Sequence, residues 1–118
     1  MFEIEYYETE NGRCPVVEFL DSIDVKLAAK ALEKIDLLED LGTALRGPNC
    51  KHLKDGIYEL RPRVGSNQVR ILYFFVVGEK IVLTHGFVKK TQKTPPKEIR
   101  KAFKYRADYL SRVEENET

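Results

Sequence analysis

Two hydrophobic periods follow one another along the first part of the chain. Residues 2–7 alternate between apolar and polar, which is the period of a half-buried strand. Residues 16–22 suit a short helix. Residues 28–38 carry apolar side chains at helical spacing, and Asp24 is placed to cap this second helix while Gly42 is placed to end it. The pattern therefore predicts a strand followed by two helices.

Turn-forming residues separate these helices from a second group of strands. The segment at residues 43–56 is rich in turn formers and reads as a loop, with a brief strand around residues 51–53. Strands are expected over residues 57–63, 69–77 and 80–89. The short connections between these three strands favour antiparallel hairpins.

A proline pair marks the start of the last helix. Thr94 precedes Pro95 and Pro96, and proline is tolerated in the first turn of a helix, where its missing donor is not needed. Apolar residues then recur along one face as far as Val113. The helices are segregated from the strands instead of alternating with them, so the predicted class is α+β.

Length and composition favour an ordinary globular protein with one domain over residues 1–118. The N-terminus lacks the layout of a signal peptide, and the apolar run at residues 71–77 is far shorter than the roughly 18 residues of a membrane span. We therefore expect a cytoplasmic protein with no membrane contact. Cys14 and Cys50 match no metal-ligand spacing and are expected to be free thiols.

The net charge of +1 conceals a strong asymmetry. Residues 1–45 carry a net charge of −7, residues 46–106 carry +11, and residues 107–118 carry −3. The lysines of the second predicted helix, Lys30 and Lys34, fall opposite its apolar side. Because the distribution of charge decides where a polyanion binds, residues 46–106 are the candidate nucleic-acid surface. The alternative is a solvated basic face.

Strand alternation brings basic side chains together. Glu59, Arg61 and Arg63 share one face of their predicted strand, and Arg70 opens the neighbouring strand. Further cations follow where the last strand ends: Lys89, Lys90 and Lys93. Arginine offers a planar fork of donors that suits phosphate, so these residues predict a seat for a phosphodiester backbone. The alternative is that they pair with the acidic first helices or with a protein partner.

The histidines and aromatic residues allow two interpretations each. His85 is flanked by residues expected to be buried, which favours a hydrogen-bonded core histidine over a catalytic one. His52 lies in the basic segment Lys51–Lys54 and is expected to be exposed. Tyr58 and Phe87 are the aromatic residues best placed to stack on a base, although core packing is the commoner role. No metal site is predicted from these residues.

The segments YELRPR, VRILYFF and LTHGFVKKTQKTPPKEI together resemble the phage-derived Gp49-like branch of HigB toxins, within the RelE/ParE superfamily. The resemblance is most specific over residues 57–100. It implies a RelE-like fold with a twisted antiparallel sheet of four to five strands, two N-terminal helices and a C-terminal helix. It also implies a toxin that cleaves mRNA in the ribosomal A site.

In such nucleases the ribose 2′-hydroxyl attacks the adjacent phosphate and leaves a 2′,3′-cyclic phosphate, without a metal ion or other cofactor. The resemblance assigns Arg61 and Arg70 to phosphate stabilisation and Lys90 to a contact with the leaving group or the RNA backbone, with His85 as a further catalytic candidate. The remaining candidates are expected to bind RNA: Lys51, His52, Lys54, Tyr58, Arg63, Lys89 and Lys93. Related nucleases place an aromatic residue or a histidine near the C-terminal end of the site, where this chain has only Thr91 and Gln92.

Two other functions stay open at this point. A ParE-like toxin would inhibit DNA gyrase through protein contacts and would not need clustered arginines. A non-catalytic RNA-binding module would keep the cations but lack a donor for the leaving group. The resemblance further implies a HigA-like helix-turn-helix antitoxin as the protein partner, alongside mRNA and the ribosome.

Overall fold

The computed structural model describes residues 2–117, so Met1 and Thr118 at the ends of the predicted domain lie outside the described residues. Three helices, one short 3-10 helix and six strands follow one another along the chain. Their order is β1 (Glu3–Tyr6), α1 (Pro15–Ser22), α2 (Val25–Leu41), η1 (Gly42–Ala44), β2 (Cys50–Lys54), β3 (Ile57–Leu60), β4 (Arg63–Val64), β5 (Asn67–Val76), β6 (Lys80–Val88) and α3 (Pro96–Glu117). The predicted α+β class is confirmed.

The sheet has the strand order β1-β6-β5-β3-β2, and the short strand β4 pairs with β5. All of its pairs are antiparallel except β1 with β6, which run parallel. The prediction of a purely antiparallel sheet of four to five strands is therefore wrong in number and in direction. A parallel pair needs a long crossover connection, and all of the chain between β1 and β6 supplies it.

The strand predicted over residues 57–63 is in fact two strands. β3 ends at Leu60, and β4 begins only at Arg63. Pro62 lies between them and has no N–H to donate to a ladder. The Arg61 amide leaves the sheet at the same point and donates to the Asn49 carbonyl at 2.9 Å. This break turns the chain at the residues expected to bind phosphate.

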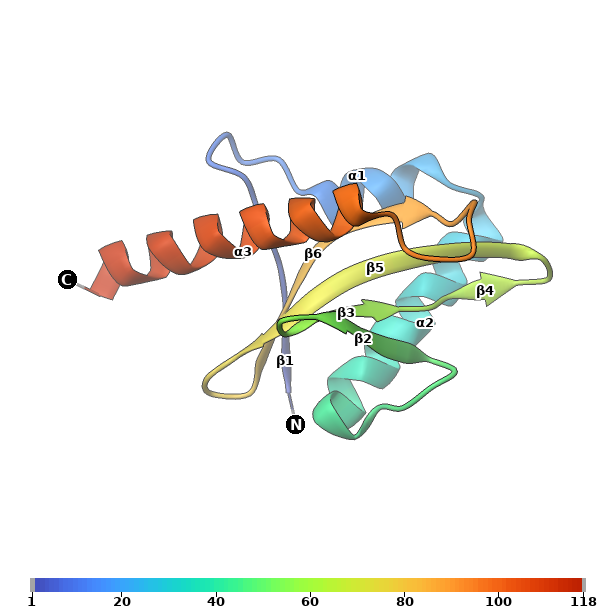
Figure 1. Ribbon diagram of the computed structural model, residues 1–118, viewed down its shortest axis with the longest axis horizontal. Helices are drawn as coiled ribbons and strands as arrows, with labels where there is room; N and C mark the ends of the chain where they lie inside the picture. The colour runs from blue at the N-terminus through green and yellow to red at the C-terminus, as the bar shows by residue number, and fades with distance from the viewer. Residues whose placement is uncertain (1, 118) are drawn as a thin grey trace.

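Helices cover both faces of the sheet, α1 and α2 on one and α3 on the other (Figure 1). Ile71 and Tyr73 of β5 belong to the core beneath α1 and α2, whereas Leu72 and Phe74 belong to the core beneath α3. Alternate residues of β5 point to opposite faces of the sheet, and both sets are buried. A strand buried on both faces reads as a continuous apolar run, which accounts for the sequence of this segment.

The helix ends follow the signals in the sequence. Pro15 occupies the first turn of α1, and the Asp24 carboxylate accepts a hydrogen bond from the Lys26 amide at 3.0 Å at the start of α2. Gly42 ends α2 with φ at 52°, a conformation that favours glycine. Gly86 of β6 lies so close to the Phe19 ring of α1 that a Cβ there would overlap with it.

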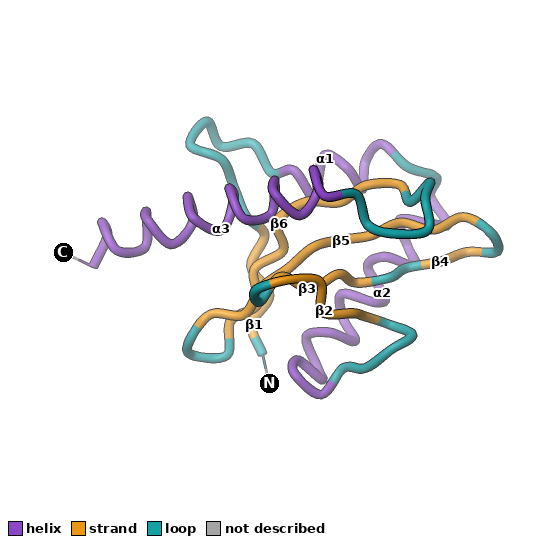
Figure 2. Tube along the Cα trace, in the orientation of Figure 1, coloured by secondary structure: helices purple, strands orange, loops and turns teal. Residues whose placement is uncertain are grey.

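Three loops lie toward the same end of the sheet: the loop between η1 and β2, the turn between β4 and β5, and the loop between β6 and α3 (Figure 2). Residues from all three line the cavities described below. Over residues 2–117, no helix combines the length and the apolar character that a bilayer crossing needs.

Candidate nucleic-acid interface

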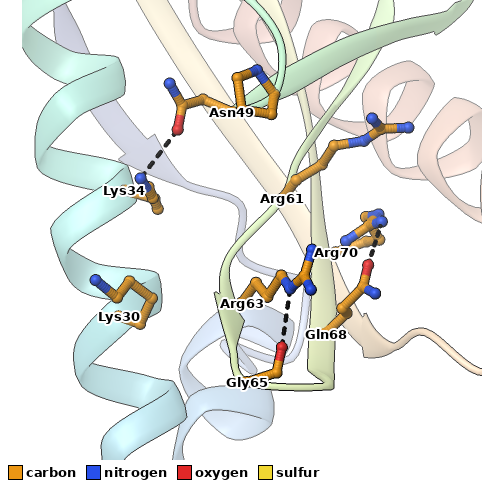
Figure 3. Close-up of a pocket in the computed structure, with 9 residues that line it drawn as sticks. Lys30, Lys34, Asn49, Arg61, Arg63, Gly65, Gln68 and Arg70 are labelled. Carbon is orange, nitrogen blue, oxygen red and sulfur yellow. Dashed lines mark hydrogen bonds between the residues drawn. The ribbon is translucent and has the colours of Figure 1, made fainter.

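The larger cavity at this end, which we call the α2 cleft, lies between α2 and the strands. Its volume is about 560 Å³. Figure 3 shows the side chains that line it, which come from α2, from the loop before β2 and from the β3–β5 segment. They are Lys30, Lys34, Pro48, Asn49, Arg61, Arg63, Gly65, Gln68 and Arg70. Five of these residues are basic and none is acidic.

A smaller cavity, the α3-side pocket, lies next to the loop that leads into α3. Its volume is about 190 Å³. The lining residues are Lys51, His52, Leu53, Glu59, Arg61, Lys89, Gln92, Lys93, Thr94 and Ile99. Arg61 lines both cavities, so its guanidinium stands at the boundary between them.

A buried carboxylate organises the arginines. Glu59 is 1% exposed, and its Oε2 lies 2.8 Å from Arg61 Nε and 3.5 Å from Arg70 Nε. Its other oxygen, Oε1, accepts a hydrogen bond from the Thr94 hydroxyl. A buried carboxylate must be paired and hydrogen-bonded to remain charged, and both oxygens of Glu59 meet that condition. Glu59 thereby fixes two arginines and anchors the loop before α3.

Arg70 is itself 3% exposed. Its Nη1 donates to the Val69 carbonyl at 2.9 Å and its Nη2 to Gln68 Oε1 at 3.0 Å, while Nε has no hydrogen-bond partner among the described residues (Figure 3). Burial lowers the pKa of the guanidinium, the Glu59 carboxylate raises it and the Arg61 charge lowers it. Arginine stays protonated despite such shifts, so this is a fixed, oriented positive charge.

Lys89 is the lysine most closely coupled to these arginines. Its pKa is lowered, first by partial burial and then by the charges of Arg70 and Arg61, while Glu59 opposes the shift. Its backbone amide donates to the Gln68 carbonyl at 2.9 Å, which ties the end of β6 to β5. Lys90 is exposed and lines a separate shallow hollow with Gln68, Lys89, Thr91 and Gln92. Lys89, and not Lys90, therefore shares a cavity with Arg61.

A family model described as phage derived protein Gp49-like (DUF891) matches residues 18–107, well over half of the chain. The chain belongs to this Gp49-like family. The matched segment contains α2, the five strands β2 to β6 and every residue that lines the two cavities. The family-level resemblance stated from the sequence is thus confirmed. No curated protein sequence matched the chain.

The cavities of this Gp49-like protein gather most of the residues that the sequence predicted for RNA contact. Arg61, Arg63 and Arg70 line the α2 cleft, and the α3-side pocket adds four more: Lys51, His52, Lys89 and Lys93. Lys54 is exposed at the end of β2 and lines neither cavity. Tyr58 faces the core beneath α2, where its ring stacks on Tyr73 with centroids 5.5 Å apart.

His85 lies in the core beneath α3 and lines neither cavity. It is 3% exposed, with Nε2 3.1 Å from Glu98 Oε1 and Nδ1 3.0 Å from the Thr84 hydroxyl. Burial lowers its pKa to about 4. The Glu98 carboxylate opposes this shift, and the Lys101 charge lowers the pKa further. The ring is therefore neutral near pH 7, and its Nε2–H can donate to the Glu98 carboxylate.

Sequence reasoning missed several residues that the Gp49-like site contains: Lys30, Lys34, Asn49, Glu59, Gln68 and Thr94. Lys30 and Lys34 are four residues apart on one side of α2, which is a visible signal, but only the packing of α2 over the strands places them at the cleft. Glu59 shares the strand face of Arg61, so alternation alone pointed to the pair. Arg61 and Arg70 pair with Glu59 of their own sheet and not with the acidic first helices.

Proposed function

We propose that this Gp49-like protein is the toxin of a type II toxin–antitoxin system and that it acts as an endoribonuclease on mRNA in the ribosomal A site. The observation that carries the proposal is the fixed arginine pair. Arg61 and Arg70 are held by one buried carboxylate beside two open, basic cavities. Preorganised cations of this kind stabilise charge that develops on a phosphate.

The proposed reaction is a transesterification within the RNA. The 2′-hydroxyl of one nucleotide gives its proton to a water molecule while its oxygen forms a bond to the adjacent phosphorus, and the bond from phosphorus to the 5′-oxygen of the next nucleotide breaks. The products are a 2′,3′-cyclic phosphate and a 5′-hydroxyl end. The nucleophile belongs to the substrate, so the protein must position the RNA, neutralise the crowded phosphorane and deliver a proton to the leaving oxygen.

Within this reaction we assign Arg61 and Arg70 to the phosphorane. Lys89 is the favoured donor to the leaving oxygen, since a lowered pKa makes an ammonium group a better acid near neutral pH. Lys90, the residue assigned by family resemblance, would then contact the backbone outside the reaction centre. Glu59 is a positioning residue, because its two oxygens are already occupied by Arg61, Arg70 and Thr94. His85 takes no part in this proposal.

The direct test uses ribosomes programmed with a defined mRNA. We expect cuts within the A-site codon. The phosphate at each new 3′ end should resist alkaline phosphatase until the cyclic ester is opened. The same transcript without ribosomes should be cut far more slowly, because the ribosome supplies the alignment of the 2′-hydroxyl. The Arg61→Ala variant serves as the inactive control.

Other results would contradict the proposal in distinct ways. Stable complexes of gyrase with cleaved DNA, with mRNA left intact, would indicate a ParE-like toxin instead. Tight binding of mRNA with no cleavage on or off the ribosome would indicate a non-catalytic RNA-binding module. Equal cutting of free and ribosome-bound transcripts at the same positions would contradict the ribosome dependence.

A toxin of this kind needs an antitoxin, and we propose a HigA-like helix-turn-helix protein that binds the α1–α2 side. This region carries the −7 net charge of residues 1–45 and leaves apolar side chains exposed: Val17, Val25, Leu32 and Leu41. An antitoxin bound there would block entry into the ribosome by its bulk. Reversing the charges of Lys89 and Lys90 should then abolish toxicity but keep antitoxin binding. Loss of the complex in that variant would place the antitoxin on the basic cavities.

A further inference from the structure

The α2 cleft extends the arginine site toward α2, a helix that the sequence did not assign to the RNA-binding surface. Lys30 and Lys34 of α2 line this cleft together with Arg61 and Arg63 (Figure 3). Both lysines belong to residues 1–45, whose net charge is −7, so the net charge of that region does not indicate a basic surface. Their placement at the cleft comes from the packing of α2 against the strands.

Lys34 is tied to the arginine site through one residue. Its Nζ donates to Asn49 Oδ1 at 2.9 Å, and the carbonyl of the same asparagine accepts the Arg61 amide at 2.9 Å. Asn49 is partly buried and lies in the loop before β2. The ammonium group of Lys34 is therefore held at a set position relative to Arg61, and no carboxylate of the described residues forms an ion pair with it.

Two further cations of the cleft, Lys30 and Arg63, are only weakly neutralised. Lys30 meets Glu33 at 3.2 Å, but that pair is partly exposed and contributes little. The Nε of Arg63 donates to the Gly65 carbonyl at 2.8 Å, which orients the guanidinium without cancelling its charge. A concave surface that collects one sign of charge attracts a ligand of the other sign, and a cleft of about 560 Å³ has room for part of a nucleotide.

We propose that Lys30, Lys34 and Arg63 bind a second phosphate of the RNA chain, next to the phosphate held by Arg61 and Arg70. The RNA backbone then passes over Arg61, which lines both cavities, and continues into the α2 cleft. This inference rests on the proposed function, because it concerns the same bound RNA. It adds α2 to the substrate-binding surface and extends the site by at least one nucleotide.

The test compares two uncleavable RNA probes of different length. A dinucleotide and a tetranucleotide, both 2′-O-methylated at every ribose, are titrated into the full chain at several salt concentrations. Affinity is followed by NMR, with the side-chain amides of Asn49 and Gln68 as reporters inside the cleft. The variants are Lys30→Ala with Lys34→Ala, Lys34→Gln to remove the charge alone, and Lys26→Ala as a matched control. Lys26 also lies on α2 but does not line the cleft.

For the native chain we expect the tetranucleotide to bind more tightly and with a salt slope steeper by about 0.7 for each added phosphate contact. The double variant should lose about fivefold or more in affinity for the tetranucleotide and the added slope, while dinucleotide binding stays within about twofold. Lys34→Gln should lose part of the same increment. Lys26→Ala should leave both probes within about twofold.

Two sets of results would overturn the inference, and they are distinguishable from a failure of the proposed function. Equal small effects of the double variant and Lys26→Ala, with Arg61→Ala still lowering affinity, would mean that RNA binds but does not enter the α2 cleft. Unchanged RNA binding with loss of antitoxin binding in the double variant would assign the cleft to an acidic protein partner. If neither probe binds the native chain, the inference fails; if Arg61→Ala also cleaves ribosome-bound mRNA at the native rate, the proposed function fails with it.

Discussion

Two buried ionic clusters lie on the α3 side of the sheet, and they differ in what surrounds them. Glu59 is buried beside Arg61 and Arg70, and those arginines line a cleft that is open to solvent. His85 is buried beside Glu98 and lines neither cavity. One cluster keeps permanent positive charges at the edge of the core, and the other holds a ring that is neutral near pH 7.

This difference separates a functional arrangement from a structural one. Burying an arginine is costly, and an apolar residue in its place is often as stable, so the buried Arg70 beside the buried Glu59 is poorly explained by stability alone. A neutral histidine that donates to a carboxylate satisfies two buried polar groups at low cost. Proximity to a cavity, more than burial or charge by itself, is therefore our reason for proposing Arg61 and Arg70 as the site.

The largest effect is expected at Arg61. Its replacement by alanine should slow cleavage of ribosome-bound mRNA by about 10²- to 10³-fold, since one preorganised charge at the phosphorane is lost. The thermal midpoint should also fall, because the buried Glu59 carboxylate loses its nearest cationic partner, so cleavage is compared at a temperature where both chains are folded. The control is Arg46→Ala. Arg46 is an exposed arginine of the basic region at residues 46–106, and it lines neither cavity. A folded Arg61→Ala variant with native cleavage rates would contradict the functional role that we propose for the Glu59–Arg61–Arg70 cluster.

The next effect is on stability, at His85. Its pKa is lowered from 6.5 in the unfolded chain to about 4 in the folded one, so the unfolded chain binds more protons between these values. The free energy of unfolding should therefore fall as pH drops from about 6.5 to about 4, by up to about 3 kcal/mol. Urea unfolding of the native chain and of His85→Gln across this range measures the difference. A native chain with the same pH profile as His85→Gln would show that the ring titrates freely.

A smaller effect distinguishes the two carboxylates. Glu59→Gln keeps the shape but removes the charge that holds Arg61 and Arg70, so we expect cleavage to slow by about tenfold, together with a stability loss of about 1–3 kcal/mol. Glu98→Gln should cost about 1 kcal/mol and leave the cleavage rate within about twofold. Single-turnover cleavage and urea unfolding of both variants provide the measurements. Equal losses of activity in the two variants would mean that both carboxylates act through stability.

Local sequence signals predicted the elements but not their long-range pairing. The cap at Asp24 and the prolines at 15 and 96 set helix starts through contacts within a few residues, so they are readable. The parallel pairing of β1 with β6 depends on residues about 77 positions apart, such as Glu3 and Lys80, and no local pattern encodes it. The strand break could have been read, because Pro62 cannot take part in a central ladder.

The same distinction holds for the site. Alternation and short connections were sufficient to bring Arg61, Arg63 and Arg70 together, because all three lie in neighbouring strands or their turns. Lys34 reaches the cleft only through the packing of α2, and its position depends on its contact with Asn49. The burial of Glu59 is likewise a tertiary property that the alternation of its strand could not reveal.

The smallest expected effect on cleavage is that of an exposed lysine outside the cavities, which we compare with a lysine that lines one. Lys54 and Lys89 both belong to the basic region at residues 46–106. Lys54 is exposed and lines neither cavity. Lys89 lines the α3-side pocket, and the charges of Arg61 and Arg70 lower its pKa. Lys54→Ala should therefore change the rate of mRNA cleavage by less than about twofold, since an isolated exposed charge is screened by salt within about 10 Å. Lys89→Ala should slow it by about 10²-fold or more, since a positioned proton donor contributes about 10²- to 10⁴-fold. Both rates are measured on ribosome-bound mRNA at 0.1 M salt, where that screening length applies. If Lys54→Ala slows cleavage as much as Lys89→Ala, the basic surface acts as a diffuse field and not through the two cavities.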